Sequence, residues 1–202
     1  MAQMDSLVSL LQEELKDIYD AEKRLTKALP KMIRKASAGE LQDALDEHLR
    51  QTENHIERIE QAFEQLGLPA RGKTCEGMKH LIAEGEDMIS EAEDDATRDA
   101  VMIAAAQKVE HYEIAAYGTI RTWANLLGKD EVAALMEETL EEEKAADQKL
   151  TQIAEGFVNQ MAAQGDRDDE EEEEETPRRR VSRRSTARAP RSVAAARARR
   201  GR

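Results

Sequence analysis

The chain is poor in cysteine, proline and aromatic side chains. Its 202 residues include one cysteine, four prolines, two phenylalanines, three tyrosines and one tryptophan. The single cysteine, Cys75, excludes an intrachain disulfide, so a reducing cytoplasm is the compartment that we expect. Strands are enriched in aromatic and β-branched residues, so their scarcity argues against a sheet. The abundance of Ala, Glu, Leu, Lys and Arg instead favours long helices.

Long apolar runs are also missing. No segment approaches the roughly 18 consecutive apolar residues that a membrane-spanning helix needs. Residues 1–5 lack the basic and apolar regions of a signal peptide. We therefore expect a cytoplasmic protein without membrane contact, and a chain of this length can hold one full domain with a sizeable core.

Charge is distributed unevenly along the chain. Residues 1–165 contain 34 acidic residues and 18 Lys or Arg residues, a net charge of −16. Eight consecutive acids follow at 168–175, and residues 176–202 contain 11 Arg and no acid. Mutual repulsion of the acids and the lack of core-forming residues predict a disordered tail over 166–202. We expect a helical domain over 1–165, separate from this tail.

Turn residues divide the domain into four long helices and one short helix. The long helices are expected at about 5–36, 40–66, 96–127 and 130–163, and the short one at about 75–92. The break at 37–39 and Gly128 leave only short loops, which join antiparallel neighbours. Gly67 ends the second helix and begins a long connection. Two hairpins joined by one crossover predict an all-α fold, the ferritin-like antiparallel four-helix bundle with a short crossover helix.

Ionisable residues interrupt the apolar stripe of every long helix near its midpoint. They are Glu22 in the first helix, His48 and His55 in the second, Glu110 and Glu113 in the third, and Glu143 and Asp147 in the fourth. The pairs three or four residues apart share one helix face. The midpoints of helices in an up-and-down bundle lie at one level. We therefore expect five carboxylates and at least one imidazole to converge in one small volume.

Such a convergence needs compensating cations. Two carboxylates about 4 Å apart repel by ~4 kcal/mol even at an effective dielectric constant of about 20. Besides the histidines, the only inward base that we expect is Arg121, two turns beyond Glu113. Two metal ions would offset the repulsion, and carboxylate plus imidazole ligands suit iron or manganese. The sequence therefore predicts a site for two metal ions, iron or manganese.

Simpler interpretations apply to single residues. One inward Glu is more often salt-bridged than metal-bound, so the metal hypothesis depends on four helices sharing the same feature at the same depth. We interpret His80 and His111 as structural or solvated, and Glu141 and Glu142 as solvated charges. Cys75 is either a thiol whose pKa the dipole of the short helix lowers or, more commonly, a small buried apolar residue.

Four segments form a pattern found in a known family. They are IYDAEK at 18–23, KTCEGM at 73–78, AAAQKVEHYEIAAYG at 104–118 and ETLEEEKAAD at 138–147. On these segments the chain resembles the ferritin-like YciE/YciF family of bacterial stress proteins, over about residues 4–160. The resemblance implies a homodimer with a rubrerythrin-like di-metal site. Two positions depart from that pattern, since Gln51 stands where the family often has Glu and Asp147 where a rubrerythrin-like site has a histidine.

The expected function is redox chemistry on peroxide or oxygen, of the peroxidase or ferroxidase type. Tyr117, one turn from Glu113, is either a radical or hydrogen-bonding partner of the site or a packing residue. The competing class is a non-enzymatic metal-binding or structural stress protein. The Arg-rich tail predicts weak, non-specific binding of nucleic-acid phosphates, with neutralisation of the neighbouring acids as the alternative.

Overall fold

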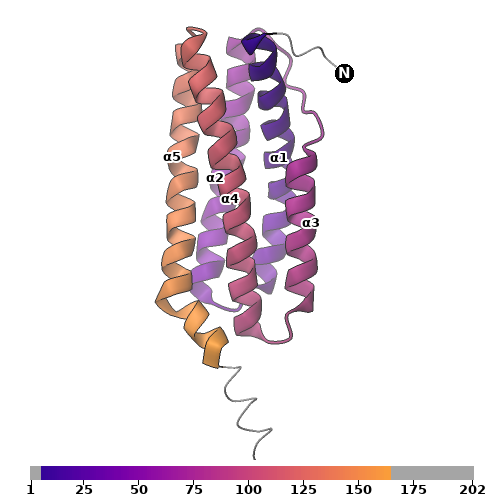
Figure 1. Ribbon diagram of the computed structural model, residues 1–202, viewed down its shortest axis with the longest axis vertical. Helices are drawn as coiled ribbons and strands as arrows, with labels where there is room; N and C mark the ends of the chain where they lie inside the picture. The colour runs from indigo at the N-terminus through magenta and orange to yellow at the C-terminus, as the bar shows by residue number, and fades with distance from the viewer. Residues whose placement is uncertain (1–5, 165–202) are drawn as a thin grey trace, which may run out of the picture.

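The computed structural model describes residues 6–164, which form an elongated bundle of helices (Figure 1). The long helices are α1 (Leu7–Lys35), α2 (Gly39–Gln65), α4 (Asp95–Leu126) and α5 (Asp130–Ile153), and the short helix is α3 (Glu76–Glu91). No strand occurs among these residues. The predicted all-α bundle with its short crossover helix is therefore confirmed, whereas the tail predicted over 166–202 lies outside the described residues.

Local chemistry sets the ends of the helices. Ser6 caps α1 by accepting a hydrogen bond from the backbone amide of Ser9, and Asp94 caps α4 in the same way. Gly67 and Gly128 follow α2 and α4 with φ of +67° and +63°. A left-handed residue at this position lets the next amides bond the last carbonyls of the helix, which favours glycine.

The four long helices are arranged as two antiparallel hairpins. α1 pairs with α2 and α4 pairs with α5, while α2 packs on α5 and α1 packs on α4. α3 lies outside the four and covers the edge between α1 and α4 (Figure 1). The amide of Lys73 donates to the carbonyl oxygen of Lys16 at 3.0 Å, and that of Cys75 donates to Asp20 at 2.8 Å. These bonds attach the crossover to α1 and position α3.

A π-helical turn interrupts the fourth long helix. α5 continues as η1 (Ala154–Val158), and residues 159–164 are again α-helical. The sequence predicts one uninterrupted inward line through Ala154 to Met161, but Met161 is 55% exposed while Ala154 is buried. A π turn accommodates an extra residue and rotates everything after it about the helix axis. Of the described helices, none is long and apolar enough to span a bilayer.

Candidate metal centre

Six ionisable side chains from the four long helices meet inside the bundle. They are Glu22 on α1, His48 and His55 on α2, Glu110 and Glu113 on α4, and Glu143 on α5. All are buried, and the most exposed, His48, shows only 7% of its surface to solvent. Their neighbours along each helix face are the apolar side chains of the core, such as Leu15, Ile18 and Ile120. The predicted convergence therefore occurs for these six residues.

The six residues form two groups with ligand geometry. In one, His48, Glu110, Glu113 and Glu143 each offer a ligand atom within 4.8 Å of the others. In the other, Glu22, His55 and Glu143 do the same. Glu143 is the only member of both groups, so it is the residue that would serve both sites if two ions were bound.

Short polar contacts define how the two histidines are oriented. His55 Nδ1 lies 3.1 Å from Glu143 Oε1 and 3.4 Å from Glu22 Oε1. His48 Nε2 lies 3.3 Å from Glu110 Oε1. The buried hydroxyl of Tyr117 donates a hydrogen bond to Glu22. His55 thus directs Nδ1 into the cluster, while Tyr117 holds one oxygen of the α1 carboxylate.

Polar atoms without hydrogen-bond partners are concentrated in this cluster. Among residues 6–164, nine buried side-chain oxygen and nitrogen atoms make no hydrogen bond, and every one belongs to the six residues named above. Both oxygens of Glu113 and both of Glu143 are among them. A buried, unsatisfied polar group costs about 1–3 kcal/mol, and more where it is charged. This donor set, made of carboxylate oxygens and imidazole nitrogens, fits metal ions such as iron or manganese.

Burial and mutual repulsion alter the acidity of these groups. Burial, and then the neighbouring carboxylates, raise the pKa of Glu113 well above its ordinary value, and burial is also the main cause that raises the pKa values of Glu110 and Glu143. Burial by itself lowers the pKa of His55, but the negative carboxylates of Glu143 and Glu22, 3.1 and 3.4 Å from its Nδ1, outweigh burial and raise this pKa to about 11. Two divalent cations would balance the charge of the four carboxylates, which could then all stay ionised.

A second layer supports His55. Its Nε2 lies 2.8 Å from Glu142 Oε2, and Arg58 donates to both oxygens of Glu142 at 2.5 and 3.0 Å. Such a carboxylate fixes the tautomer of a metal-facing histidine, because Nε2 then carries the proton and Nδ1 keeps its lone pair. The expectation that Glu142 is a solvated charge is wrong. The available signal was the spacing of His55 and Arg58, which places both on one face of α2.

Asp147 and Arg121 do not take the places predicted for them. Asp147 Oδ1 accepts a hydrogen bond from Gln107 at 3.1 Å and lies 3.5 Å from the exposed His111, outside both groups. The hydrogen bond from Gln107 keeps this carboxylate at the seam between α4 and α5. An aspartate side chain is also shorter than a glutamate and reaches less far into the bundle. Arg121 pairs with Glu137 at the surface, at 2.6 Å, so it is not an inward base.

Cys75 is a small buried residue and not a thiol whose pKa the helix dipole lowers. It is fully buried, and its Sγ lies 3.1 Å from the hydroxyl oxygen of Tyr112, which in turn donates to Asp17 at 2.7 Å. Burial, followed by the hydrogen bond to Asp17, raises the pKa of the thiol to about 11. The helix dipole at the start of α3 therefore does not control this cysteine.

Two cavities connect this cluster with the surface. One, of about 310 Å³, lies between α1, α3 and α4, and the other, of about 400 Å³, lies between α2 and α5. His48 and Glu110 line both. Gln51 lines the second cavity and belongs to neither group of ligand atoms. Small molecules and ions therefore have two approaches to the same pair of residues.

Comparison with known proteins places this bundle among bacterial relatives. YciF from Escherichia coli (strain K12) is 49% identical over 149 residues, which cover 73% of this chain and 90% of YciF. The crystal structure of this E. coli stress protein matches with a TM-score of 0.74, covering 77% of this chain and 99% of that one at 46% identity. YcfI, a structural-protein candidate from Rhodopseudomonas palustris, matches with a TM-score of 0.72 at 42% identity, covering 75% and 98% of the two chains.

A more distant structure shares the fold alone. This protein from Xanthomonas campestris pv. campestris matches with a TM-score of 0.60 at 21% identity, covering 79% of this chain and 98% of its own. The model of a domain family of unknown function, DUF892, matches residues 6–163, almost the whole helical region. The chain therefore belongs to the DUF892 family, and the resemblance to YciE/YciF proteins inferred from its motifs is confirmed.

Proposed function

We propose that this protein binds two iron or manganese ions at the bundle centre and uses them for redox chemistry on peroxide or oxygen as a stress protein. The observation that carries the proposal is the concentration of all nine unpartnered buried polar atoms of residues 6–164 in six side chains. A core that leaves four carboxylates unsatisfied is costly unless cations bind there. The related E. coli protein is described as a stress protein, which is consistent with this role.

The two groups of side chains support an assignment of the ligands. Glu22 and His55 would hold one ion, and His48, Glu110 and Glu113 the other, with Glu143 between them. Four carboxylates and two divalent ions form a neutral set, whereas the same carboxylates without cations repel one another at short range. When bound, such a pair of ions supplies two electrons, one from each ion, to an oxidant.

The surrounding side chains prepare the site for that chemistry. Glu142 and Arg58 hold the His55 ring so that Nδ1 faces the centre. Tyr117 donates its hydroxyl hydrogen to Glu22, one of the side chains that would hold an ion. Apolar side chains such as Val109 and Leu25 limit the water that reaches the centre, because they line the cavity from the α3 side.

Metal content tests the first half of the proposal. We expect protein produced with iron or manganese to retain about two ions per chain, and the Glu143→Ala variant to lose both, because only Glu143 belongs to both groups. Elemental analysis measures the stoichiometry, and Glu141→Ala, at an exposed position on the same helix, is the control. Equal metal content in the two variants would contradict the assignment.

Peroxide consumption tests the second half. We expect the metal-loaded protein to consume hydrogen peroxide and Glu110→Ala to do so at least about 100-fold more slowly, as expected when a ligand to a catalytic ion is removed. Anomalous diffraction at the iron and manganese edges identifies the ion. Equal rates in the two proteins, at equal metal content, would instead favour the alternative of a non-enzymatic metal-binding or structural protein, a class to which the description of YcfI points.

A further inference from the structure

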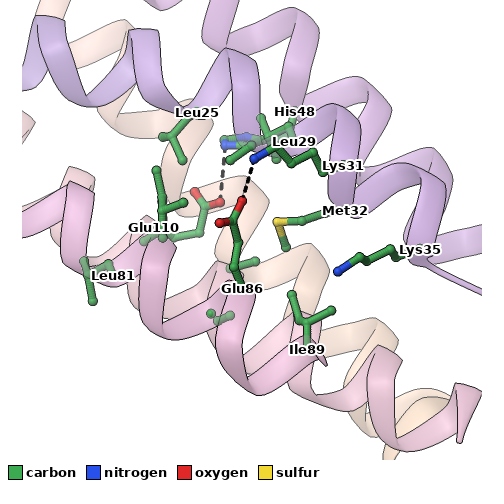
Figure 2. Close-up of a pocket in the computed structure, with 16 residues that line it drawn as sticks. Leu25, Leu29, Lys31, Met32, Lys35, His48, Leu81, Glu86, Ile89 and Glu110 are labelled. Atoms are coloured by element: carbon green, nitrogen blue, oxygen red, sulfur yellow. Dashed lines mark hydrogen bonds and ion pairs between the residues drawn. The ribbon is translucent and has the colours of Figure 1, made fainter. Parts of the chain in front are cut away.

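The cavity between α1, α3 and α4 is almost entirely apolar. Its volume is about 310 Å³, within the range of small-molecule binding sites. Leucine, isoleucine, methionine, valine and alanine side chains form its walls, including Leu25, Leu29, Met32, Leu81 and Ile89 (Figure 2). A cavity with such walls favours an alkyl chain over a hydrated solute.

The inner end of this cavity is polar and belongs to the metal centre. His48 and Glu110 line it, and the dashed contact between them is seen in Figure 2. Both residues are at least nine-tenths buried, and both ring nitrogens of His48 and Glu110 Oε2 make no hydrogen bond with any described residue. A molecule in the cavity would therefore place one of its atoms next to groups that face the candidate ions.

The outer end of the cavity has a local excess of positive charge. Lys31 pairs with Glu86 at 2.7 Å across the rim, and the exposed side chain of Lys35 points toward the cavity in Figure 2. The two lysines outnumber the one acid, although residues 1–165 have a net charge of −16. An anionic head group is thus favoured at this rim and disfavoured over most of the remaining surface.

The second cavity has the opposite character. Glu40, Asp43 and Glu47 lie along the α2–α5 opening, with Lys149 as the basic side chain of its lining. An acidic opening attracts cations and repels anions. The two approaches to His48 and Glu110 therefore differ in chemistry, with one suited to metal ions and the other to an amphipathic molecule.

We propose that the α1–α3–α4 cavity binds the alkyl chain of an amphipathic carboxylate, with the head group at Lys35 and the chain directed toward His48 and Glu110. Resting on the function proposed above, this assigns fatty-acid hydroperoxides as the substrate class. With both ions bound, the centre would supply the two electrons, one from each ion, and water the two protons that reduce the hydroperoxide to an alcohol and water with cleavage of its O–O bond.

Calorimetric titration of the metal-free protein with decanoate tests the cavity directly. We expect saturable binding of one decanoate per chain, and at least about tenfold weaker binding of decyltrimethylammonium and of acetate, each of which lacks one of the two features that the site recognises. Equal binding of decanoate and decyltrimethylammonium would show that the rim lysines do not select the head group, and would overturn the proposal.

Two pairs of variants locate the bound molecule. Ala106→Leu fills the proposed cavity and should weaken decanoate binding at least about tenfold, whereas Ala146→Leu adds the same volume to the α2–α5 cavity and should not. Lys35→Glu reverses a charge without touching the core and should weaken binding about threefold or more, with Lys149→Glu as its control. Binding unaffected by both Ala106→Leu and Lys35→Glu would place decanoate elsewhere and refute the site.

Turnover distinguishes this inference from the function on which it rests. If the metal-loaded protein reduces a fatty-acid hydroperoxide faster than hydrogen peroxide, and Ala106→Leu reverses that order, both proposals hold. Decanoate binding without any peroxide turnover would refute the proposed redox function and leave the binding site intact. Turnover of hydrogen peroxide without decanoate binding would support the redox function and refute the proposed binding site.

Discussion

Glu142 shows how a single residue outside the metal-facing groups controls their geometry. Its carboxylate joins His55 to Arg58, and it lies next to Glu143 in the chain but on the outer side of the histidine ring. Without this acceptor the Nε2–H of a buried imidazole has no partner and the ring is free to take the wrong tautomer. Glu142 therefore sets the orientation of a side chain that would hold a metal ion.

We predict that Glu142→Ala weakens metal binding by about 10- to 100-fold, the usual effect of removing such a supporting carboxylate. Glu142→Gln should have a smaller effect, because its amide oxygen can still accept from Nε2–H. Competition with a coloured chelator measures the affinity, and Glu141→Ala provides the matched neighbour. Unchanged affinity in Glu142→Ala would show that packing alone orients His55.

A second prediction at this scale concerns Cys75. With its pKa raised to about 11 by burial, the thiol is protonated at neutral pH and inaccessible to reagents. Iodoacetamide should alkylate it at least about 100-fold more slowly in the native protein than in denaturant, because reaction requires opening of the crossover. Mass spectrometry follows the modification. Comparable rates in the two states would mean that the crossover opens readily.

At the scale of elements, one buried carboxylate joins the two hairpins. Asp99 on α4 is 2% exposed and accepts hydrogen bonds from the backbone amides of Ser37 and Ala38 at 2.9 and 2.7 Å, and from the Ser37 hydroxyl at 2.6 Å. These donors belong to the loop between α1 and α2, whose helices supply Glu22, His48 and His55. The position of the first hairpin against the second therefore depends partly on Asp99.

We predict that Asp99→Ala lowers the free energy of unfolding by about 3 kcal/mol, because it leaves buried donors of the loop without an acceptor. Asp46→Ala, at an exposed site on α2, should change it by less than about 0.5 kcal/mol. Urea unfolding of the metal-free proteins, followed by circular dichroism, gives both values. Equal midpoints in the two variants would show that apolar contacts alone hold the loop.

Turn chemistry made the elements predictable from sequence, and the π turn was the exception. Gly67 and Gly128 end α2 and α4 as expected, because a left-handed residue there needs no tertiary context. No sequence signal between Ala154 and Val158 predicts the π-helical turn found there. The helical periodicity therefore predicts an inward-facing Met161, although this side chain lies on the surface.

At the scale of the whole molecule, the buried carboxylates would make the proposed metal binding depend on pH. Burial raises the pKa values of Glu110, Glu113 and Glu143, so protons compete with cations for these carboxylates more strongly than they do at exposed ones. A cation must displace these protons, which makes its affinity rise with pH and fall as pH decreases.

We therefore predict that added Mn²⁺ raises the melting temperature, and that the increase is larger at about pH 7.5 than at about pH 5.5, because ligand binding stabilises the native state according to its affinity. Scanning calorimetry with and without the ion measures the increase, and Mg²⁺ is the control for general ionic effects. A larger increase at the lower pH would contradict the carboxylate ligand set.

The Arg-rich segment at 176–202 lies outside the described residues, and its role stays a prediction. We expect the full chain to shift DNA in a gel at low ionic strength, without sequence preference, and a chain ending at Gln164 not to, because the 11 Arg can contact phosphates. Near physiological salt the shift should disappear, since the acids at 168–175 compete for the same side chains. Equal behaviour of the two chains would indicate intramolecular neutralisation or a protein partner.

The sequence by itself determined the helices, their pairing into hairpins and the depth of Glu22, His55, Glu110 and Glu143. These properties follow from hydrophobic periodicity, turn residues and distance along each helix, which are local. Only the tertiary structure decided that Asp147 bonds Gln107 while Glu142 supports His55, and that two cavities of different chemistry reach His48. The rotation of each helix about its axis and the reach of each side chain settle those outcomes, and both depend on what the neighbouring helices present.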